Sequence, residues 1–467
     1  MTRKTLPMSL MPAPVEQTIE TLPAQRLPGR ATRRSPGARR ASAAGVQAPA
    51  RAVVVHSGAR DSYQVARALE EAGLLERLVT DLYWPAQAPW ARRVAGLLPG
   101  AVRAMLQQRH EPHLPAARVR TLVARGLLVL LLDRMRQAPF AWRRRATRRA
   151  DAALGVCAGR LARATQAVLV TYSYYAYHAL SAYSGPALLF QLHPHPASMR
   201  RILRRELAAH PDCAESLGKE WELALPEQDY ARLVEETRMT TRLLAASSFT
   251  RATLVENGIP ESAITVVPYG VDSTHFSPGE RTPAAGEPLQ LLFVGRINQR
   301  KGIKYLLEAL RRFTSAEVQL EVCGRVVDDL ALFAPFAGQV TVRPSVTADE
   351  LLAAYRAADL FVFPSLGEGF GQVLLEALAC GLPILSTTST AAPDLIEDGV
   401  QGFIVAPRDA AALGDRIAWA LTHRSELRAM AAAARVRAEA FPWDRFRAGV
   451  AMAVGELLLQ PEAGRHV

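Results

Sequence analysis

Two glutamates stand out in the segment 361-FVFPSLGEGFGQVLLEALACGLPILST-387, which is otherwise largely apolar. From Val373 to Cys380 every residue except Glu376 is apolar or small, so a helix there offers that carboxylate no polar face. A buried carboxylate needs definite hydrogen-bond partners. Glu376 is therefore either a structural residue that binds nearby backbone or a residue that accepts from ligand hydroxyls, such as the two of a ribose.

Glu368 lies in the turn Gly-Glu-Gly-Phe-Gly immediately before that helix. Glycines let the backbone approach a ligand closely, and the N–H groups of Phe370 and Gly371 at the helix start favour an anion such as phosphate. An exposed loop glutamate is usually just solvated, but beside a phosphate it is useful only for contacting an attached sugar. We therefore predict that Gly369, Phe370 and Gly371 bind a phosphate and that Glu368 contacts the hydroxyls of a sugar attached to it.

The cations for such a site follow another expected strand, in 292-LFVGRINQRKGIKYLLEAL-310. Arg296 comes directly after Gly295 at the strand end, and Lys301 begins the next helix. Together they can neutralise a diphosphate, because the Arg296 guanidinium can donate two parallel hydrogen bonds and the Lys301 ammonium is a compact positive charge. The alternative is a pair of surface charges. The sequence contains no GxxxxGK[ST] phosphate loop, and the glycine turn lacks the third glycine of a dinucleotide fingerprint.

Two series of alternating strands and helices position these residues. Apolar runs predict strands at 52–55, 167–173, 187–193, 243–248 and 264–270, and then at 289–295, 318–324, 339–343, 359–365, 383–387 and 403–405. Helical spacing predicts helices at 301–313, 348–358, 371–381, 393–398 and 442–458. The fold class is therefore α/β, with two facing Rossmann-like domains of parallel strands and an interdomain cleft as the ligand site.

The domain boundaries follow from composition. Residues 1–50 are rich in Ala, Pro, Arg and Ser without periodicity, which predicts a disordered basic leader. The amino-terminal domain spans 51–280, and the segment 276-FSPGERTPAAGEP-288 marks the boundary. The carboxyl-terminal domain spans 286–440. Residues 441–460 are predicted to form a helix that returns to the amino-terminal domain.

The basic charge of the chain is local. Of a net +12 over 467 residues, residues 90–165 contribute sixteen arginines against three acids, and 1–50 contribute eight basic residues against two acids. In 90–110 and 118–136 arginines alternate with apolar residues at helical spacing, and 142-WRRRATRR-149 follows. Basic amphipathic helices lie on anionic bilayers. We expect residues 90–149 to contact a membrane surface and, because no binding module accompanies the charge, no nucleic acid.

Other classes of protein are disfavoured. The start of the chain has no apolar core of a secretory signal, and the apolar run 126–132 is far too short to span a bilayer. The four cysteines form no CxxC pair, which argues against a disulfide framework or a zinc site and fits the cytosol.

Together these features resemble glycosyltransferase family 4. The resemblance rests on Glu368 and Glu376 with seven residues between them, on Arg296 and Lys301 after the FVGR strand, and on 246-ASSFTRATLVENGIPESAITVVPYGVD-272. It is strong over about 245–410 and weak before. It implies the GT-B fold and a retaining hexosyltransferase that uses a nucleotide-diphosphate sugar without a metal or other cofactor.

The resemblance also implies residue roles. Arg296 and Lys301 hold the diphosphate with the amides of Phe370 and Gly371, Glu368 touches the donor sugar, and Glu376 binds the ribose. Preorganised cations favour the diphosphate as it gains charge during bond breaking.

In the amino-terminal half the match thins to two positions. The family often has a Gly-Gly turn after the first strand, where this chain has His56-Ser57-Gly58, so Gly58 is a candidate acceptor contact. His193, at the end of the strand 187–193, stands about where the family places a sugar-contacting histidine. His195 competes with it for that role.

The expected protein is a transferase at the cytoplasmic face of the membrane, where it acts on a glycan or lipid-linked acceptor in surface-polysaccharide or glycolipid synthesis, including exopolysaccharide or lipopolysaccharide. Two alternatives remain open. One is a GT-B sugar-nucleotide epimerase or phosphorylase, which needs no membrane patch. The other is a non-catalytic sugar-nucleotide binding protein.

Overall fold

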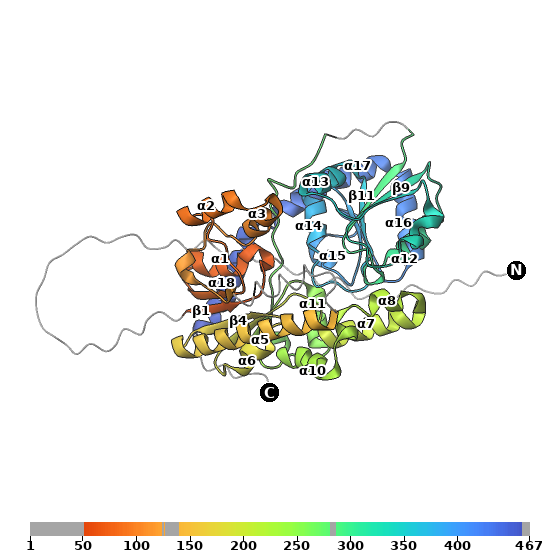
Figure 1. Ribbon diagram of the computed structural model, residues 1–467. Coiled ribbons are helices and arrows are strands. Elements are labelled where there is room, and N and C mark those ends of the chain that lie inside the picture. Colours follow the sequence, from red (N-terminus) through yellow and green to blue (C-terminus); the bar gives the residue numbers. More distant parts are fainter. Residues whose placement is uncertain (1–50, 124–125, 127–139, 281–285, 460–467) are drawn as a thin grey trace, which may run out of the picture. The chain divides into compact units, whose positions relative to one another are not determined.

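The computed structural model describes residues 51–123, 126, 140–280 and 286–459. The expected leader at 1–50 lies outside them, as do part of the expected domain boundary, residues 281–285, and most of the expected helix at 118–136. Within the described residues two parallel sheets organise the chain (Figure 1). Here the part built on the first sheet is the amino lobe and the part built on the second is the carboxyl lobe.

The amino lobe has seven strands in the order β3-β2-β1-β4-β5-β6-β7, and all neighbours are parallel. The strands are β1 Ala52–Val55, β2 Leu75–Thr80, β3 Val119–Thr121, β4 Val168–Tyr172, β5 Ala187–Gln191, β6 Arg242–Ala245 and β7 Ile264–Val266. Its longer helices are α1 Gln64–Glu71, α2 Pro89–Leu97, α3 Gly100–Gln107, α5 Phe140–Thr165, α7 Pro196–Ala209, α10 Glu227–Glu236 and α11 Ser248–Val255. Short ones are α6 Tyr177–Ser181, α8 Ala214–Leu217 and α9 Trp221–Ala224, with 3-10 turns at Arg60–Tyr63, Ala116–Arg118, Pro211–Cys213 and Glu261–Ala263.

The carboxyl lobe has six parallel strands in the order β10-β9-β8-β11-β12-β13. They are β8 Leu289–Val294, β9 Val318–Cys323, β10 Val340–Arg343, β11 Leu360–Phe363, β12 Ile384–Thr387 and β13 Gly402–Val405. The helices are α12 Ile303–Leu310, α13 Ala348–Ala357, α14 Gln372–Ala379, α15 Ala392–Leu395, α16 Ala410–Thr422, α17 Arg424–Glu439 and α18 Trp443–Leu459, with 3-10 turns at Gln299–Lys301 and Leu330–Phe336.

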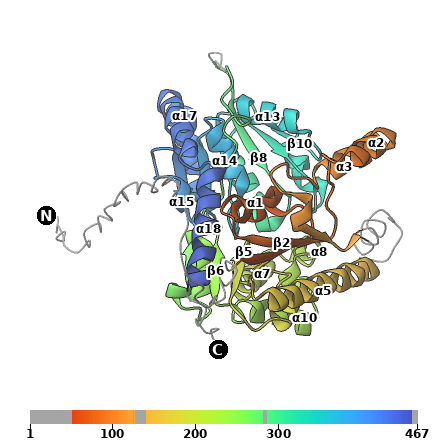
Figure 2. The same ribbon diagram turned by 90° about the vertical axis from the view of Figure 1, so that its left-hand side faces the viewer.

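Helices cover both faces of each sheet, as buried parallel strands require. In β1, Ala52 and Val54 point into one core and Val53 and Val55 into another, because successive side chains alternate across a strand. Figures 1 and 2 show α1 and α18 on one face of this sheet and α5 on the other. In the second sheet α12 packs with α16, and α14 packs with α17.

The last helix belongs by contact to the first sheet. α18 packs on α1, and Arg447 binds Glu71 and Gln64 of that helix, with Arg447 Nε 2.7 Å from Glu71 Oε2. The chain thus crosses to the amino lobe after α17.

One expected helix is wrong where the structure describes it. Residues 119–121 form the edge strand β3, paired with β2, and not part of a helix over 118–136. Strand β2 was also missed. The expectation of α/β architecture with two parallel sheets is confirmed.

Candidate active site

The loop after β8, which carries Arg296 and Lys301 and is here called the cationic loop, meets the glycine turn 367–371. They meet at the point where the strand order of the second sheet reverses. β8 and β11 are neighbours there, and the loops that follow them leave toward opposite faces of the sheet. Ligands of open α/β sheets bind in the crevice that such loops form. The loop after β8 carries Arg296 and Lys301, and the loop after β11 carries Glu368.

Lys301 and Glu368 form a buried ion pair at this point. Lys301 Nζ bonds Glu368 Oε2, and the two side chains are 9% and 14% exposed. Burial lowers the pKa of Lys301 to about 8, although the nearby Glu368 opposes that shift. Burial acts to raise the pKa of Glu368, but Lys301 and Arg300 outweigh it and lower the value to about 2. Both groups are therefore charged at neutral pH.

Arg296 does not join this pair. Its guanidinium binds Glu220, with Arg296 Nη2 3.1 Å from Glu220 Oε1. Glu220 immediately precedes α9 of the amino lobe and also accepts from Asn298 Nδ2 at 2.7 Å. The two cations expected to share one diphosphate thus each have a carboxylate of their own.

Arg300 connects the two pairs, and sequence reasoning missed it. Arg300 Nε lies 3.4 Å from Glu220 Oε2, and its Nη1 lies 3.6 Å from Glu368 Oε2. Arg300 Nη1 also donates to the Gly367 carbonyl at 3.0 Å, which ties the two loops together. Its position next to Lys301 was the available signal, whereas nothing local marked Glu220, which is far away in sequence.

The glycine turn is packed against the amino lobe. The Gly369 carbonyl accepts from Ser247 Oγ and Thr250 Oγ1, the latter at 3.0 Å. A Cβ on Gly369 would lie 1.8 Å from the Leu192 carbonyl oxygen, so only glycine fits. Gly371 caps α14 with φ 86°, a left-handed conformation that glycine adopts without strain.

The other expected donor-binding residues surround this turn. Phe370 is buried against the Tyr269 ring, with centroids 5.4 Å apart. In the part of the chain that the structure describes, no protein acceptor binds the amide of Phe370 or Gly371. Gly295 directly follows β8 with φ 150°, and its N–H donates to the Cys323 carbonyl at 2.9 Å.

Glu376 has a definite partner, which is a side chain and not the backbone. Tyr355 Oη donates to Glu376 Oε2 at 2.9 Å. Burial raises the pKa of Glu376, and the Tyr355 hydrogen bond partly offsets that shift. Glu376 lies on α14, eight positions after Glu368, and does not contact the Lys301 pair.

The structure separates the two candidate histidines. His195 caps α7, and its Nδ1 accepts from Ala197 N at 3.2 Å, so its role is structural. His193 is half-buried beside the Tyr174 ring, with centroids 4.9 Å apart. Burial lowers the pKa of His193 to about 4, and the charges of Glu368, Arg300 and Lys301 also act on it. His193 therefore lies near the glycine turn as a neutral imidazole.

Gly58 lies in the turn after β1 with φ 78°. Its N–H donates to Asp81 Oδ1 at 2.9 Å, and its carbonyl is 2.8 Å from His56 Nδ1. These contacts stay within the amino lobe. They do not bring Gly58 to the residues of the glycine turn.

Comparison with known proteins identifies the carboxyl lobe. Residues 280–437 match the family model described as glycosyl transferases group 1. Over these residues the carboxyl lobe is similar to group 1 glycosyltransferases. The matched segment contains Arg296, Lys301, Glu368 and Glu376.

The relatives and solved structures extend this finding. The chain is 35% identical over 241 residues to a D-inositol 3-phosphate glycosyltransferase of Geodermatophilus obscurus, a match that covers 46% of this chain and 53% of the relative. The chain thus spans about half the length of the curated relatives it matches.

Two solved structures share the fold at low identity. One is Anabaena HepE in complex with UDP-glucose, with a TM-score of 0.53, 16% identity and coverage of 88% of this chain and 99% of that one. The other is WaaG, a glycosyltransferase involved in lipopolysaccharide biosynthesis, with a TM-score of 0.54, 18% identity and coverage of 86% and 99%. The expectation of the GT-B fold is confirmed.

Proposed function

We propose that the chain is a retaining, metal-independent glycosyltransferase that moves a hexose from a nucleotide-diphosphate sugar to a glycan or lipid-linked acceptor. The observation that carries the proposal is the cation set Arg296, Arg300 and Lys301 with its partners Glu220 and Glu368, at the strand-order reversal of the carboxyl lobe. The UDP-glucose bound by HepE, which shares the fold, supports a uridine nucleotide as donor.

Each residue then has a chemical task. The acceptor oxygen forms a bond to the anomeric carbon while the bond from that carbon to the diphosphate oxygen breaks, and the electron pair goes to the diphosphate. The hydroxyl proton passes to a phosphate oxygen. Lys301 and Arg296 stabilise the leaving charge, Glu368 orients the sugar, and Glu376 binds the ribose. These side chains supply the charge that a metal ion would otherwise supply.

Binding of nucleotides tests the donor site directly. UDP should raise the melting temperature of the full chain, since a ligand of the native state stabilises it by mass action. Lys301→Ala should weaken UDP binding about 10- to 100-fold, because a hydrogen bond to a charged group contributes about 1.5–3 kcal/mol. Calorimetric titration of UDP, UDP-glucose and GDP-mannose gives these values.

The matched control is Lys219→Ala, which removes an exposed lysine that pairs with Glu215, four residues earlier in the chain. Equal UDP affinity in the wild type and Lys301→Ala would contradict the donor site. Nucleoside diphosphate release that depends on an acceptor separates a transferase from an epimerase or a binding protein.

We also propose that the protein works at the cytoplasmic face of a membrane, in surface-polysaccharide or glycolipid synthesis. On α2, Trp90, Val94 and Leu97 are exposed at 55%, 40% and 87% and recur at helical spacing. Arg92 and Arg93 are exposed on the same helix. An apolar stripe flanked by arginines fits an anionic bilayer surface. No helix among the described residues has the length and hydropathy needed to cross a bilayer.

Liposome binding tests this surface. Arg92→Glu with Arg93→Glu should lower affinity for phosphatidylglycerol vesicles at least 10-fold, since each basic residue near an anionic surface contributes about 1 kcal/mol. The control is Arg311→Glu with Arg428→Glu, two exposed arginines of the carboxyl lobe. Cosedimentation at low and high salt gives the answer. Absence of binding between the wild-type protein and anionic vesicles would contradict the membrane proposal.

A further inference from the structure

A small pocket opens at the carboxyl end of β4 in the amino lobe. Its walls come from α5, from the loop and short helix that follow β4, and from α9 and α10. The order of the first sheet reverses between β1 and β4, so the loops after these strands frame the crevice where ligands of this fold bind. The pocket lies beside this crevice. In the first sheet the crevice occupies the position that the donor site occupies in the second sheet.

Aromatic side chains dominate the lining, in the form of Tyr174, Tyr175, Tyr177 and Trp221. The Tyr174 and Trp221 rings meet edge to face with centroids 6.1 Å apart, and Trp221 is 37% exposed. A pyranose has one apolar C–H face and a rim of hydroxyls. Flat aromatic walls with a few polar groups match both parts of such a ring.

Tyr174 and His193 link the pocket to the donor site. Tyr174 lies against His193, and His193 lies beside the glycine turn, since a Cβ on Gly369 would be 3.0 Å from His193 Cα. A group seated against Tyr174 is therefore one residue away from the carboxylate that we assign to the donor sugar.

The aromatic loop is held in one conformation by buried carboxylates. Glu236 Oε2 accepts from the Tyr174 amide at 2.8 Å and Glu236 Oε1 from the Tyr177 amide at 3.0 Å. Tyr174 has φ 73° and its hydroxyl bonds Glu222. A strained residue fixed from three sides is typical of a preorganised binding site.

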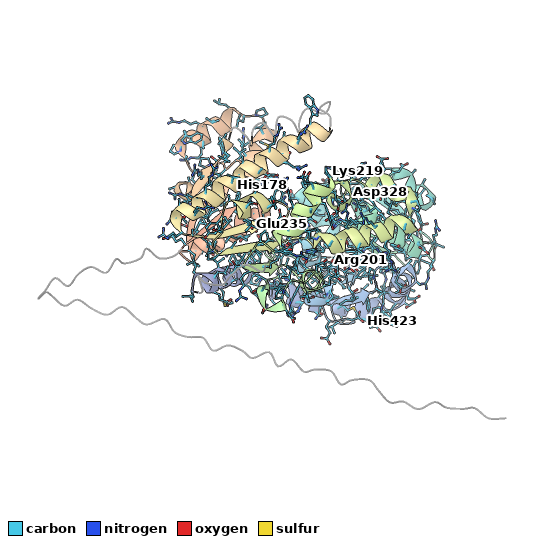
Figure 3. All side chains as sticks on the ribbon, turned by 90° about the horizontal axis from the view of Figure 1, so that it is seen from below. His178, Arg201, Lys219, Glu235, Asp328 and His423 are labelled. Carbon is cyan, nitrogen blue, oxygen red and sulfur yellow. The ribbon has the colours of Figure 1, made fainter. Side chains whose placement is uncertain are left out.

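The charges in the lining decide the kind of ligand. Arg148 and Arg232 both bind Asp229, and Arg232 also covers the Tyr177 ring at 5.3 Å. Burial lowers the pKa of His178, which Figure 3 labels beside α5, so this side chain is neutral at pH 7. Asp151 adds a further acid. Among the described lining residues every cation is thus already paired or neutral, which disfavours a phosphate group.

We infer that this pocket binds a neutral saccharide unit of the acceptor, with Trp221 and Tyr174 as its specificity-determining walls. The inference rests on the proposed function and separates this chain from relatives whose names specify D-inositol 3-phosphate. The pocket volume of about 70 Å³ admits the edge of a sugar ring and not a lipid chain.

Acceptor-dependent UDP release tests the inference. The full chain is given UDP-glucose with methyl glycosides of glucose, galactose and mannose, with maltose, or with D-inositol 3-phosphate, each up to 100 mM. A neutral saccharide should stimulate UDP release in the wild type. Trp221→Ala should raise the KM for that saccharide about 10-fold or more, because buried aromatic anchors dominate binding. The Kd for UDP should stay within about twofold, since the indole of Trp221 carries no charge and the diphosphate is assigned to Arg296 and Lys301.

Tyr230→Ala is the matched control. It removes a tyrosine ring from α10 that packs on Arg200 outside the pocket. Trp221→Phe keeps an aromatic wall in case the alanine variant fails to fold. A saccharide that quenches tryptophan fluorescence in the wild type should lose that signal in Trp221→Phe.

Two results would overturn the inference while the donor site stands. One is UDP binding with no stimulation by any neutral saccharide. The other is stimulation by D-inositol 3-phosphate that Trp221→Ala leaves unchanged. Failure of the wild type to bind UDP would instead remove the proposed function, and the acceptor pocket with it.

Discussion

At the scale of single residues, the candidate site is a set of opposite charges that neutralise one another. Lys301 and Glu368 form one pair, and Glu220 accepts from Arg296 and lies beside Arg300. Removing one member of a buried pair leaves an uncompensated charge, which is strongly destabilising. An entering diphosphate can meet these cations without that penalty, because it brings its own negative charge. The pairs thus keep the cations charged in the absence of ligand.

The depressed pKa of Lys301 predicts a pH dependence of UDP binding. Burial lowers this pKa to about 8, so above pH 8 the free protein has lost the charge and must take up a proton to bind UDP. The Kd should therefore rise above pH 8 by up to about 10-fold per pH unit. Titration calorimetry between pH 7 and 9.5 checks this, and Lys301→Arg should flatten the curve. A wild-type Kd that is constant to pH 9.5 would contradict the assignment.

The depressed pKa of Lys301 has the opposite effect on folding: stability rises with pH, whereas UDP affinity falls. An unfolded lysine keeps its proton up to about pH 10.4, whereas Lys301 in the folded chain releases it near pH 8. Between these values the unfolded state binds more protons, so this group favours folding increasingly as pH rises. Deprotonation of Lys301 therefore does not promote unfolding above pH 8, so unfolding caused by this group cannot explain weaker UDP binding there.

At the scale of elements, the sequence predicts the strands and helices whose buried apolar residues form a clear pattern. The runs at 289–295 and 359–365 became β8 and β11, and their loops place Lys301 and Glu368 together. Strand β2 was missed because Glu76 and Arg77 interrupt its apolar pattern, and β3 because three residues carry too little pattern. The partner Glu220 could not be predicted, since only the tertiary fold brings it to Arg296.

The conformation of the cationic loop requires glycine at position 302, and this predicts the effect of Gly302→Ala. Gly302 has φ 74°, and a Cβ there would lie 2.0 Å from the Pro364 carbonyl oxygen, at the end of β11. Gly302→Ala should therefore move the Lys301 loop, lower stability by more than about 2 kcal/mol and weaken UDP binding. Thermal unfolding and UDP titration measure the two effects.

Gly338→Ala is the control, because Gly338 has φ 82° but open space around its Cα. It should cost only the left-handed strain, about 1–2 kcal/mol, and leave UDP binding unchanged. Equal effects of the two substitutions would show that the Pro364 contact is unimportant.

At the scale of the whole molecule, residues from both lobes build the site. Besides Glu220, the fully buried Glu206 of α7 accepts from Gln299 Nε2 at 2.6 Å and from Arg408 Nε at 2.7 Å. The Gly369 carbonyl binds α11 and its capping serine, and α18 packs on α1. A donor whose diphosphate binds the cations near Glu220 must therefore displace contacts between the lobes. Donor binding and rearrangement of these contacts are then linked.

Glu220 should accordingly compete with the donor, and its removal predicts tighter binding. In Glu220→Gln the negative charge beside Arg296 and Arg300 is lost, so UDP no longer displaces a charged partner. UDP affinity should rise about 3- to 10-fold, since a hydrogen bond to a charged group is stronger than one to a neutral amide by about 1 kcal/mol. Glu215→Gln is the control, because Glu215 is exposed and pairs with Lys219 in its own lobe. Calorimetry at fixed pH compares the three proteins. A fall in affinity in Glu220→Gln would instead mean that this carboxylate holds the guanidinium groups in place for the diphosphate.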